Sequence, residues 1–387
     1  MDKAAPDRSE LAQARRIVVK VGSRVLVGHS GRPNPRRIAA LADAAASIRA
    51  GGRELVLVSS GAIAAGMEEL GWRRRPKRLP DLQMAAAVGQ LRLMALYARH
   101  FRHHGCQIAQ VLLTHDALNV RERHLNARTT LINLLRHRIV PIINENDAVS
   151  VEEIRFGDND LLAALVAMLV DADLLILLTT VDGLRAPAGD GRTRRVPWLP
   201  SVTPRELTLV FGCRNELSTG GMASKLQSAH NVARAGIPVV IADGRRPDVL
   251  VRVLAGEDVG TLIGRPRRDR WAARDRWIGF FHKPSGTLVV DEGARRALVE
   301  HGRSLLPIGV RAVEGHFTAG AAVDIRTADG ELVARGLASY GSDDLRRILG
   351  RRTADISALL GACPYEEAVH RDHMVLLAAS DARRSPR

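Results

Sequence analysis

The sequence predicts an α/β protein, in which a three-layer αβα sandwich around a mainly parallel sheet precedes a small, mostly-β domain. Two observations support this prediction. Short β-branched runs alternate with longer helical patterns in about the first 263 residues, and later residues form short strands with Gly and Asp-Gly turns. Alternating strands and helices build a parallel sheet that is covered on both faces, whereas turn-rich strands build antiparallel sheets.

Six runs of the first region are predicted to be buried strands, namely IVVKV, ELVLVSS, IAQVLLT, IVPIINEN, LLILLTT and PVVIAD. Helical patterns such as PRRIAALADAAASIRA and LQMAAAVGQLRLMALYARHF lie between them. Ligands of open α/β sheets bind at the carboxyl ends of the strands. We therefore expect the functional residues directly after these runs.

A charged segment at residues 264–276 ends the alternation and is interpreted as a linker. Residues 1–263 are predicted to be the first domain and residues 277–372 the second, which has one helix in DEGARRALVEHG. Residues 373–387 are predicted to be a polar tail.

The composition limits the classes of function. The formal net charge is +15, which favours contact with polyanions, but only 3% of the residues are aromatic, which argues against a base-stacking surface. The three cysteines are far apart and predict neither a disulfide framework nor a zinc site, so we expect a cytoplasmic protein. We find no signal peptide, and the longest apolar run has only about ten residues, too few to cross a bilayer.

Lysine is scarce, and two of the five lysines lie beside glycine-containing turns. Lys20 is at the end of a predicted strand, and Lys225 lies in STGGMASKL, at the predicted start of a helix. A compact ammonium at such a position can contact a phosphate, and the first amides of a helix bind anions. A solvent-exposed lysine at a strand end is the alternative for Lys20, and a plain connection is the alternative for the glycine-rich loop. The chain has no Gly-Lys pair and therefore no Walker A loop.

Two further clusters follow predicted strands. Ser60 and Gly61, in VSSGAIAAG, are suited either to anion binding or to an ordinary helix N-cap. Asn144 and Asp147, in IINENDAVS, precede GDND, which includes Asn159. Carboxylates and amides together suit an α-amino acid, because Asp147 can accept from its ammonium and Asn159 can donate to its carboxylate. Asx turns and helix caps are the alternative.

Six motifs in one order resemble the glutamate 5-kinases of the amino acid kinase family: KVGS, VSSGAIAAG, LNARTTL, PIINENDAV, GDND and TGGMASKL. The second region resembles the PUA domain that follows the kinase domain in bacterial members, with VDEGA, SLLP and GLASYGSDDLRRI in place. The resemblance implies the amino acid kinase fold. It also implies transfer of the γ-phosphoryl group of ATP to the side-chain carboxylate of L-glutamate, with Mg²⁺ on the phosphates, as the first step of proline biosynthesis.

The resemblance also implies roles for individual residues. The catalytic residues are Lys20, Lys225 and Asp160, where Asp160 organises the two lysines, and no protein ligand of a metal is implied. The substrate residues are Ser60, Gly61, Asn144, Asp147 and Asn159. The ATP residues are Lys20, Thr179, Thr180, Thr219, Gly220, Gly221, Met222, Ala223, Ser224 and Lys225. Two positions differ from the family pattern: Thr180 stands where Asp is common, and Ser218 stands where Gly is usual.

The resemblance implies proline as a feedback inhibitor, and we expect a homo-oligomer that does not bind membranes. Two alternatives stay open. The chain could be another acid kinase of the same family, acting on acetylglutamate, aspartate or carbamate, or an RNA-binding protein that acts through the PUA-like domain. The two lysines with Asp160 argue against a purely RNA-binding role, and the scarcity of aromatics argues against RNA binding as an added activity.

Overall fold

The computed structural model describes residues 7–27, 31–150, 159–188, 192–202, 221–264, 279, 284–351, 355–356, 359 and 365–377. The chain divides into two compact units, Met1–Arg270 and Trp271–Arg387. Most of the predicted linker and of the predicted tail lies outside the described residues, so these boundaries stay predictions.

An eight-stranded sheet forms the centre of the first unit, in the order β3-β4-β2-β1-β5-β9-β10-β8. The strands are β1 (Arg16–Val21), β2 (Glu54–Ser59), β3 (Ile108–Leu113), β4 (Val140–Glu145), β5 (Leu174–Thr179), β8 (Trp198–Leu199), β9 (Val239–Asp243) and β10 (Thr261–Ile263). All neighbours from β3 to β9 pair in parallel, whereas β10 pairs antiparallel to β9 and β8 pairs in parallel with β10. The six predicted strands form the parallel part.

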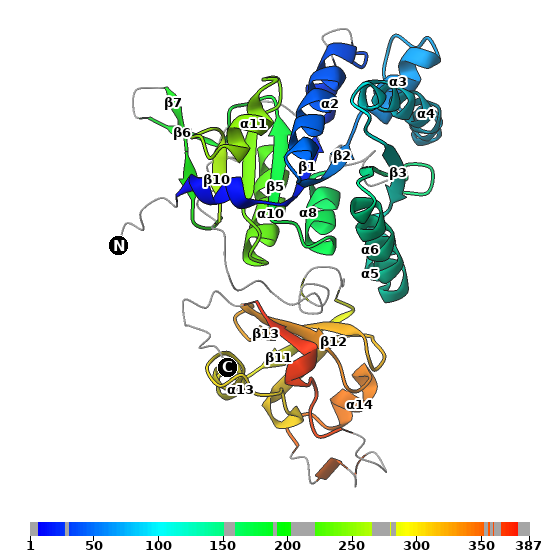
Figure 1. Cartoon of the computed structure of the whole chain (residues 1–387). Coiled ribbons are helices and arrows are strands. Elements are labelled where there is room, and N and C mark those ends of the chain that lie inside the picture. The colour runs from blue at the N-terminus through cyan, green and yellow to red at the C-terminus, as the bar shows by residue number, and fades with distance from the viewer. Residues whose placement is uncertain are drawn as a thin grey trace. The chain divides into compact units, whose positions relative to one another are not determined.

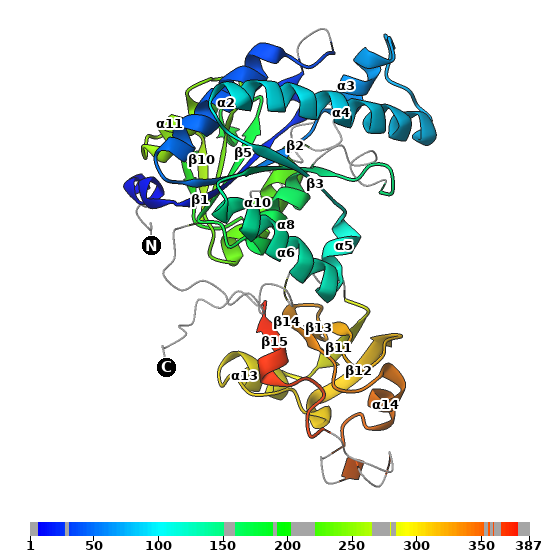
Figure 2. The same ribbon diagram turned by 45° about the vertical axis from the view of Figure 1, so that its right-hand side comes forward.

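Helices cover both faces of this sheet, which confirms the predicted three-layer αβα sandwich (Figures 1 and 2). The helical elements are η1 (Arg8–Gln13), α1 (Ser23–Leu26), α2 (Pro35–Ala50), α3 (Ala62–Glu69), α4 (Leu79–His103), α5 (His115–Asn119), α6 (Arg121–Arg136), α8 (Asp160–Leu169), α10 (Met222–Arg234) and α11 (Val249–Leu254). Figure 2 shows α2, α4 and α11 over one face and α6, α8 and α10 over the other. A separate two-stranded ribbon joins β6 (Arg185–Pro187) to β7 (Thr193–Arg195).

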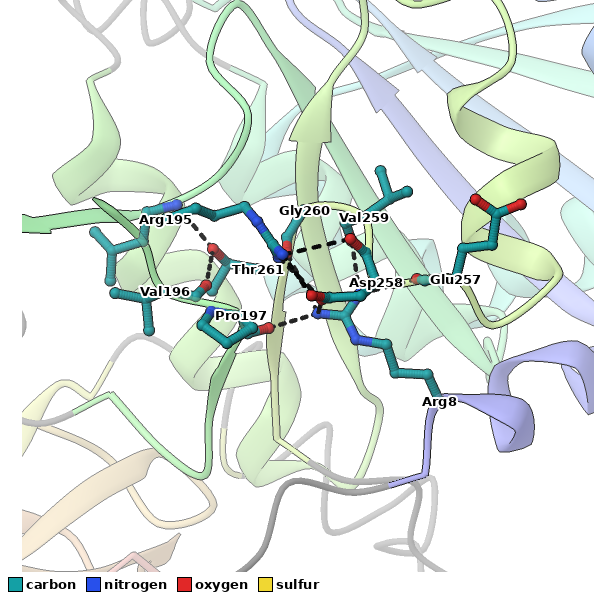
Figure 3. Close-up of polar contacts among 10 residues, drawn as sticks. Arg8, Arg195, Val196, Pro197, Glu257, Asp258, Val259, Gly260 and Thr261 are labelled. Atoms are coloured by element: carbon teal, nitrogen blue, oxygen red, sulfur yellow. Dashed lines mark hydrogen bonds and ion pairs between the residues drawn. The ribbon is translucent and has the colours of Figure 1, made fainter. Parts of the chain in front are cut away.

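The beginning of the chain is fixed to the far edge of the sheet by one arginine (Figure 3). The guanidinium of Arg8 donates to the carbonyl oxygens of Val259 at 2.6 Å and of Pro197 at 2.5 Å, and it forms an ion pair with Asp258 at 3.0 Å. Arg195 forms a second ion pair with the same carboxylate, at 2.6 Å. These contacts connect η1, the segment before β8 and the turn before β10.

The second unit is built on a five-stranded sheet in the order β12-β11-β13-β14-β15. Its elements are β11 (Gly286–Val290), α13 (Glu292–Val299), η3 (Pro307–Gly309), β12 (Val310–Gly315), β13 (Ala322–Thr327), β14 (Leu332–Leu337), α14 (Ser342–Arg347), η4 (Arg371–His373) and β15 (Met374–Leu376). The small, strand-rich module predicted from the sequence is therefore present. β15 pairs with β14 in the antiparallel direction and forms one edge of this sheet. Apolar residues of this short strand pack against the core of the unit. The strand was not predicted from the sequence, because it has only three residues and polar residues follow it.

Candidate active site

Two lysine ammonium groups meet at one carboxylate beside the carboxyl ends of the central strands. Lys20 is the fifth residue of β1, Asp160 is the first residue of α8, and Lys225 lies in the first turn of α10. The Nζ atom of Lys20 is 2.8 Å from Oδ1 of Asp160, and the Nζ atom of Lys225 is 2.8 Å from Oδ2. The structure thus brings together the three residues that were predicted to be catalytic.

All three side chains are buried, and together they have a formal charge of +1. Burial without pairing would cost each charge several kcal/mol, and the ion pairs with the shared carboxylate offset part of that cost for both ammonium groups. The first-turn position of Asp160 also places its negative charge near the positive end of the dipole of α8. The net positive charge that remains suits an anion such as a phosphate.

A chain of side-chain amides lies next to this group. Nδ2 of Asn159 donates to the backbone oxygen of Ser59 at 2.9 Å and to Oδ1 of Asn144 at 2.7 Å. It also lies 3.3 Å from Oγ of Ser60. Nδ2 of Asn144 in turn donates to Oε1 of Gln90 at 2.9 Å. Four buried side chains from separate parts of the chain are thereby joined.

Asp147 lies beyond β4 and faces a cavity. The cavity has a volume of about 280 Å³, slightly less than typical sites for drug-sized ligands, and its lining includes Gln90, Glu145 and Asp147. Oδ1 of Asp147 is buried and accepts no hydrogen bond within the described part of the chain. Burial, and then the nearby Glu145 carboxylate, raise the pKa of Asp147 to about 7, although Arg75 acts in the opposite direction.

Gly61 directly precedes α3, at its N-cap position, in a backbone conformation that favours glycine. Its φ of 104° lies in the left-handed region, and no side chain caps the helix there. The buried Ser60 just before it contacts Asn159, so the turn brings Ser60 into the amide chain. An ordinary Ser N-cap, the alternative from the sequence, is not what forms.

The residues predicted to bind the nucleotide lie in two segments of the chain. Thr179 ends β5 and Thr180 follows it, while Gly221 precedes α10, whose first turn holds Met222, Ala223 and Ser224 together with Lys225. Gly221 provides no side-chain cap, which leaves amides of the first turn for a ligand. Thr219 and Gly220, as well as the unusual Ser218, lie outside the described residues.

Gln90 was not among the predicted site residues, although the structure connects it directly to Asn144 and, through Asn144, to Asn159. The sequence pattern could have indicated the importance of this residue. Gln90 interrupts the apolar face of the helix that is now α4, and a buried polar residue needs partners. Asn159 was expected to donate to the substrate carboxylate, but its Nδ2 atom is already bonded within the protein, and it is its Oδ1 atom that has no hydrogen-bond partner among the described residues.

Within the described residues, no group of three or more His, Cys, Asp or Glu side chains has the arrangement of a metal site. None of the described helices is both long enough and apolar enough to pass through a lipid bilayer.

Known protein families match both units. The model of the amino acid kinase family matches residues 15–243, and that of the PUA domain matches residues 286–360. The first match covers more than half of the chain, and the chain therefore belongs to the amino acid kinase family.

Curated relatives assign the chain to one group within this family. "Glutamate 5-kinase" of Myxococcus xanthus is 48% identical over 97% of this chain and 100% of its own length. "Glutamate 5-kinase" of Thioalkalivibrio sulfidiphilus is 46% identical over 96% of this chain and 99% of its own length. Within its family, the chain groups with the glutamate 5-kinases. Among solved structures, carbamate kinase from Giardia lamblia bound to AMP-PNP matches with 16% identity and a TM-score of 0.47, over 66% of this chain and 99% of its own.

Proposed function

We propose that this protein transfers the γ-phosphoryl group of ATP to the side-chain carboxylate of L-glutamate, which yields glutamyl 5-phosphate for proline biosynthesis. The observations that support this most directly are the buried pair of ammonium groups on Asp160 and a cavity lined by Asp147, whose Oδ1 atom has no hydrogen-bond partner within the described residues. The first feature suits phosphates, and the second suits the α-ammonium of an amino acid.

The chemistry needs no general base. A glutamate side chain has a reference pKa of about 4.3, so the attacking carboxylate is already ionised at neutral pH. Asp160 is poorly placed for such a role in any case, because each of its oxygens forms an ion pair with a lysine. The obstacle is the approach of one anion to another, and Lys20 and Lys225 reduce that repulsion by fixed positive charge.

The site fits a metal that is held mainly by its substrate. Mg²⁺ is commonly bound through substrate phosphates with one or two carboxylates. When bound, Mg²⁺ would neutralise part of the phosphate charge. The lysines, the first turn of α10 and Thr179 with Thr180 would position the nucleotide.

The substrate assignment can be tested in one assay. ATP consumption is measured with glutamate, N-acetylglutamate and aspartate side by side, with hydroxylamine present to trap an acyl phosphate. We expect turnover with glutamate and a trapped hydroxamate. N-acetylglutamate should react poorly, because it has no ammonium for Asp147. Preference for N-acetylglutamate or aspartate would contradict the proposal and would favour another acid kinase of the family.

We also infer that proline competes with glutamate, since proline has the same α-carboxylate and an α-ammonium that Asp147 can bind. Inhibition should therefore be overcome by glutamate and not by ATP in steady-state assays. A role as an RNA-binding scaffold is not favoured, because RNA binding would not require the buried lysines and Asp160.

A further inference from the structure

We propose that Gln90 binds the α-carboxylate of the amino-acid substrate through its Nε2 atom. This inference rests on the proposed function and identifies a residue that determines its specificity. It starts from three facts: Gln90 is more than nine-tenths buried, its Nε2 atom has no hydrogen-bond partner within the described residues, and its side chain lines the 280 Å³ cavity together with Asp147.

The amide chain fixes which atom of Gln90 is the donor. Nδ2 of Asn159 faces the backbone oxygen of Ser59, which can only accept, so this atom must be the donor. Oδ1 of Asn144 then accepts from Asn159, its Nδ2 donates, and Oε1 of Gln90 accepts. The remaining atom of Gln90 is therefore an N–H donor, and rotating the amide by 180° would break the chain.

A buried amide with an unsatisfied donor costs free energy, so its retention requires an explanation. The cavity supplies one. Gln90 and Asp147 both line it, and Nε2 of Gln90, a donor, and Oδ1 of Asp147, an acceptor, have no hydrogen-bond partner within the described residues. An α-amino acid offers the complementary pair, a carboxylate and an ammonium attached to the same carbon. Gln90 thus takes the carboxylate, and Asp147 takes the ammonium.

Gln90→Glu tests this assignment, because it keeps the length of the side chain and an oxygen for Asn144 but replaces the donor by an anionic acceptor. Three ligands are compared: L-glutamate as substrate, and 4-aminobutyrate and the α-amide of L-glutamate as competitors. The first competitor lacks the α-carboxylate, and the second has an N–H donor in its place. Gln107→Glu makes the same change in charge at an exposed position and serves as the control.

We expect kcat/KM for glutamate to fall by about tenfold to 100-fold in Gln90→Glu, as for the loss of one hydrogen bond to a charged group. The inhibition constant of 4-aminobutyrate should change little, the α-amide should bind better relative to glutamate, and KM for ATP should stay the same. Gln107→Glu should match the unaltered enzyme.

Two results would overturn the inference. An unchanged kcat/KM for glutamate would exclude the contact, and equal weakening of all three ligands would show that Gln90 acts only by supporting Asn144. If Gln90→Glu does not fold, Gln90→Met gives the same comparison of glutamate with 4-aminobutyrate without a buried charge. Absence of glutamate-dependent ATP turnover in the unaltered enzyme would instead refute the proposed function itself.

Discussion

At the scale of single residues, the two oxygens of Asp160 hold the two catalytic ammonium groups in place. The carboxylate forms an ion pair with each lysine and so restricts the movement of both before ATP arrives. Such preorganised charge stabilises a transition state because little reorganisation is needed during the reaction.

We expect Lys20→Ala or Lys225→Ala to lower kcat by at least about 100-fold, as for removal of one preorganised stabilising group. Each change removes a positive charge where the phosphoryl group passes, whereas KM for glutamate should change less. Steady-state assays of the purified variants measure both constants. Lys77→Ala, which removes an exposed lysine, is the control. Near-normal turnover in either active-site variant would exclude that lysine from catalysis.

The pKa of Asp147 predicts how glutamate use depends on pH. Burial and Glu145 raise this pKa to about 7, so Asp147 is mostly ionised above pH 7 and mostly protonated below it. Only the ionised form attracts the substrate ammonium. We expect kcat/KM for glutamate to fall as the pH decreases through about 7, and Asp147→Asn should lower kcat/KM and remove this step. A profile that is flat between pH 6 and 8 in the unaltered enzyme would contradict the role of Asp147.

At the scale of elements, α3 and α4 pack so closely that side chains are excluded between them. A Cβ atom at Gly89 would lie 1.8 Å from the backbone oxygen of Ala62, and one at Gly66 would lie 1.7 Å from that of Ala85. Because backbone cannot move aside as a flexible side chain can, both positions require glycine. This contact fixes the start of α3, directly after Ser60 and Gly61, against the helix that carries Gln90.

We expect Gly89→Ala to destabilise the first unit by about 1–3 kcal/mol, the usual cost of overpacking. It should also raise KM for glutamate, because separating the helices moves Ser60 away from Asn159. Gly293→Ala in the exposed part of α13 is the matched control, since the nearest atom there is a side-chain oxygen 3.3 Å away. Thermal unfolding and glutamate titrations measure the two effects, and equal stability of the two variants would disprove the packing argument.

Local pattern was sufficient to predict most elements of the first unit. Apolar β-branched runs gave the six parallel strands, and helical periodicity gave α2 and α4. Strand β10 was missed because its three residues are too short for a pattern, and its antiparallel direction depends on tertiary pairing with β9. The same holds for Gln90, whose importance depends on Asn144 and Asn159, residues that are distant in sequence. The convergence of Lys20, Asp160 and Lys225 was expected only from the resemblance to a family, since spacing alone does not define it.

At the scale of the whole molecule, every described residue of the candidate site belongs to the first unit, Met1–Arg270. The two units also have separate apolar cores. We therefore expect the chain truncated after Arg270 to keep glutamate-dependent ATP turnover, with kcat and both KM values within a few-fold of those of the full chain. A truncated protein that folds by circular dichroism but has no turnover would show that the second unit contributes to catalysis.

The anchoring of Arg8 has a consequence for biosynthesis. Its partners lie about 250 positions later in the chain, at Val259 and Asp258. A ribosome must therefore release nearly the entire first unit before the amino-terminal turn can reach its final place. Until then, the edge of the nascent sheet stays incomplete, and chaperones can bind to it.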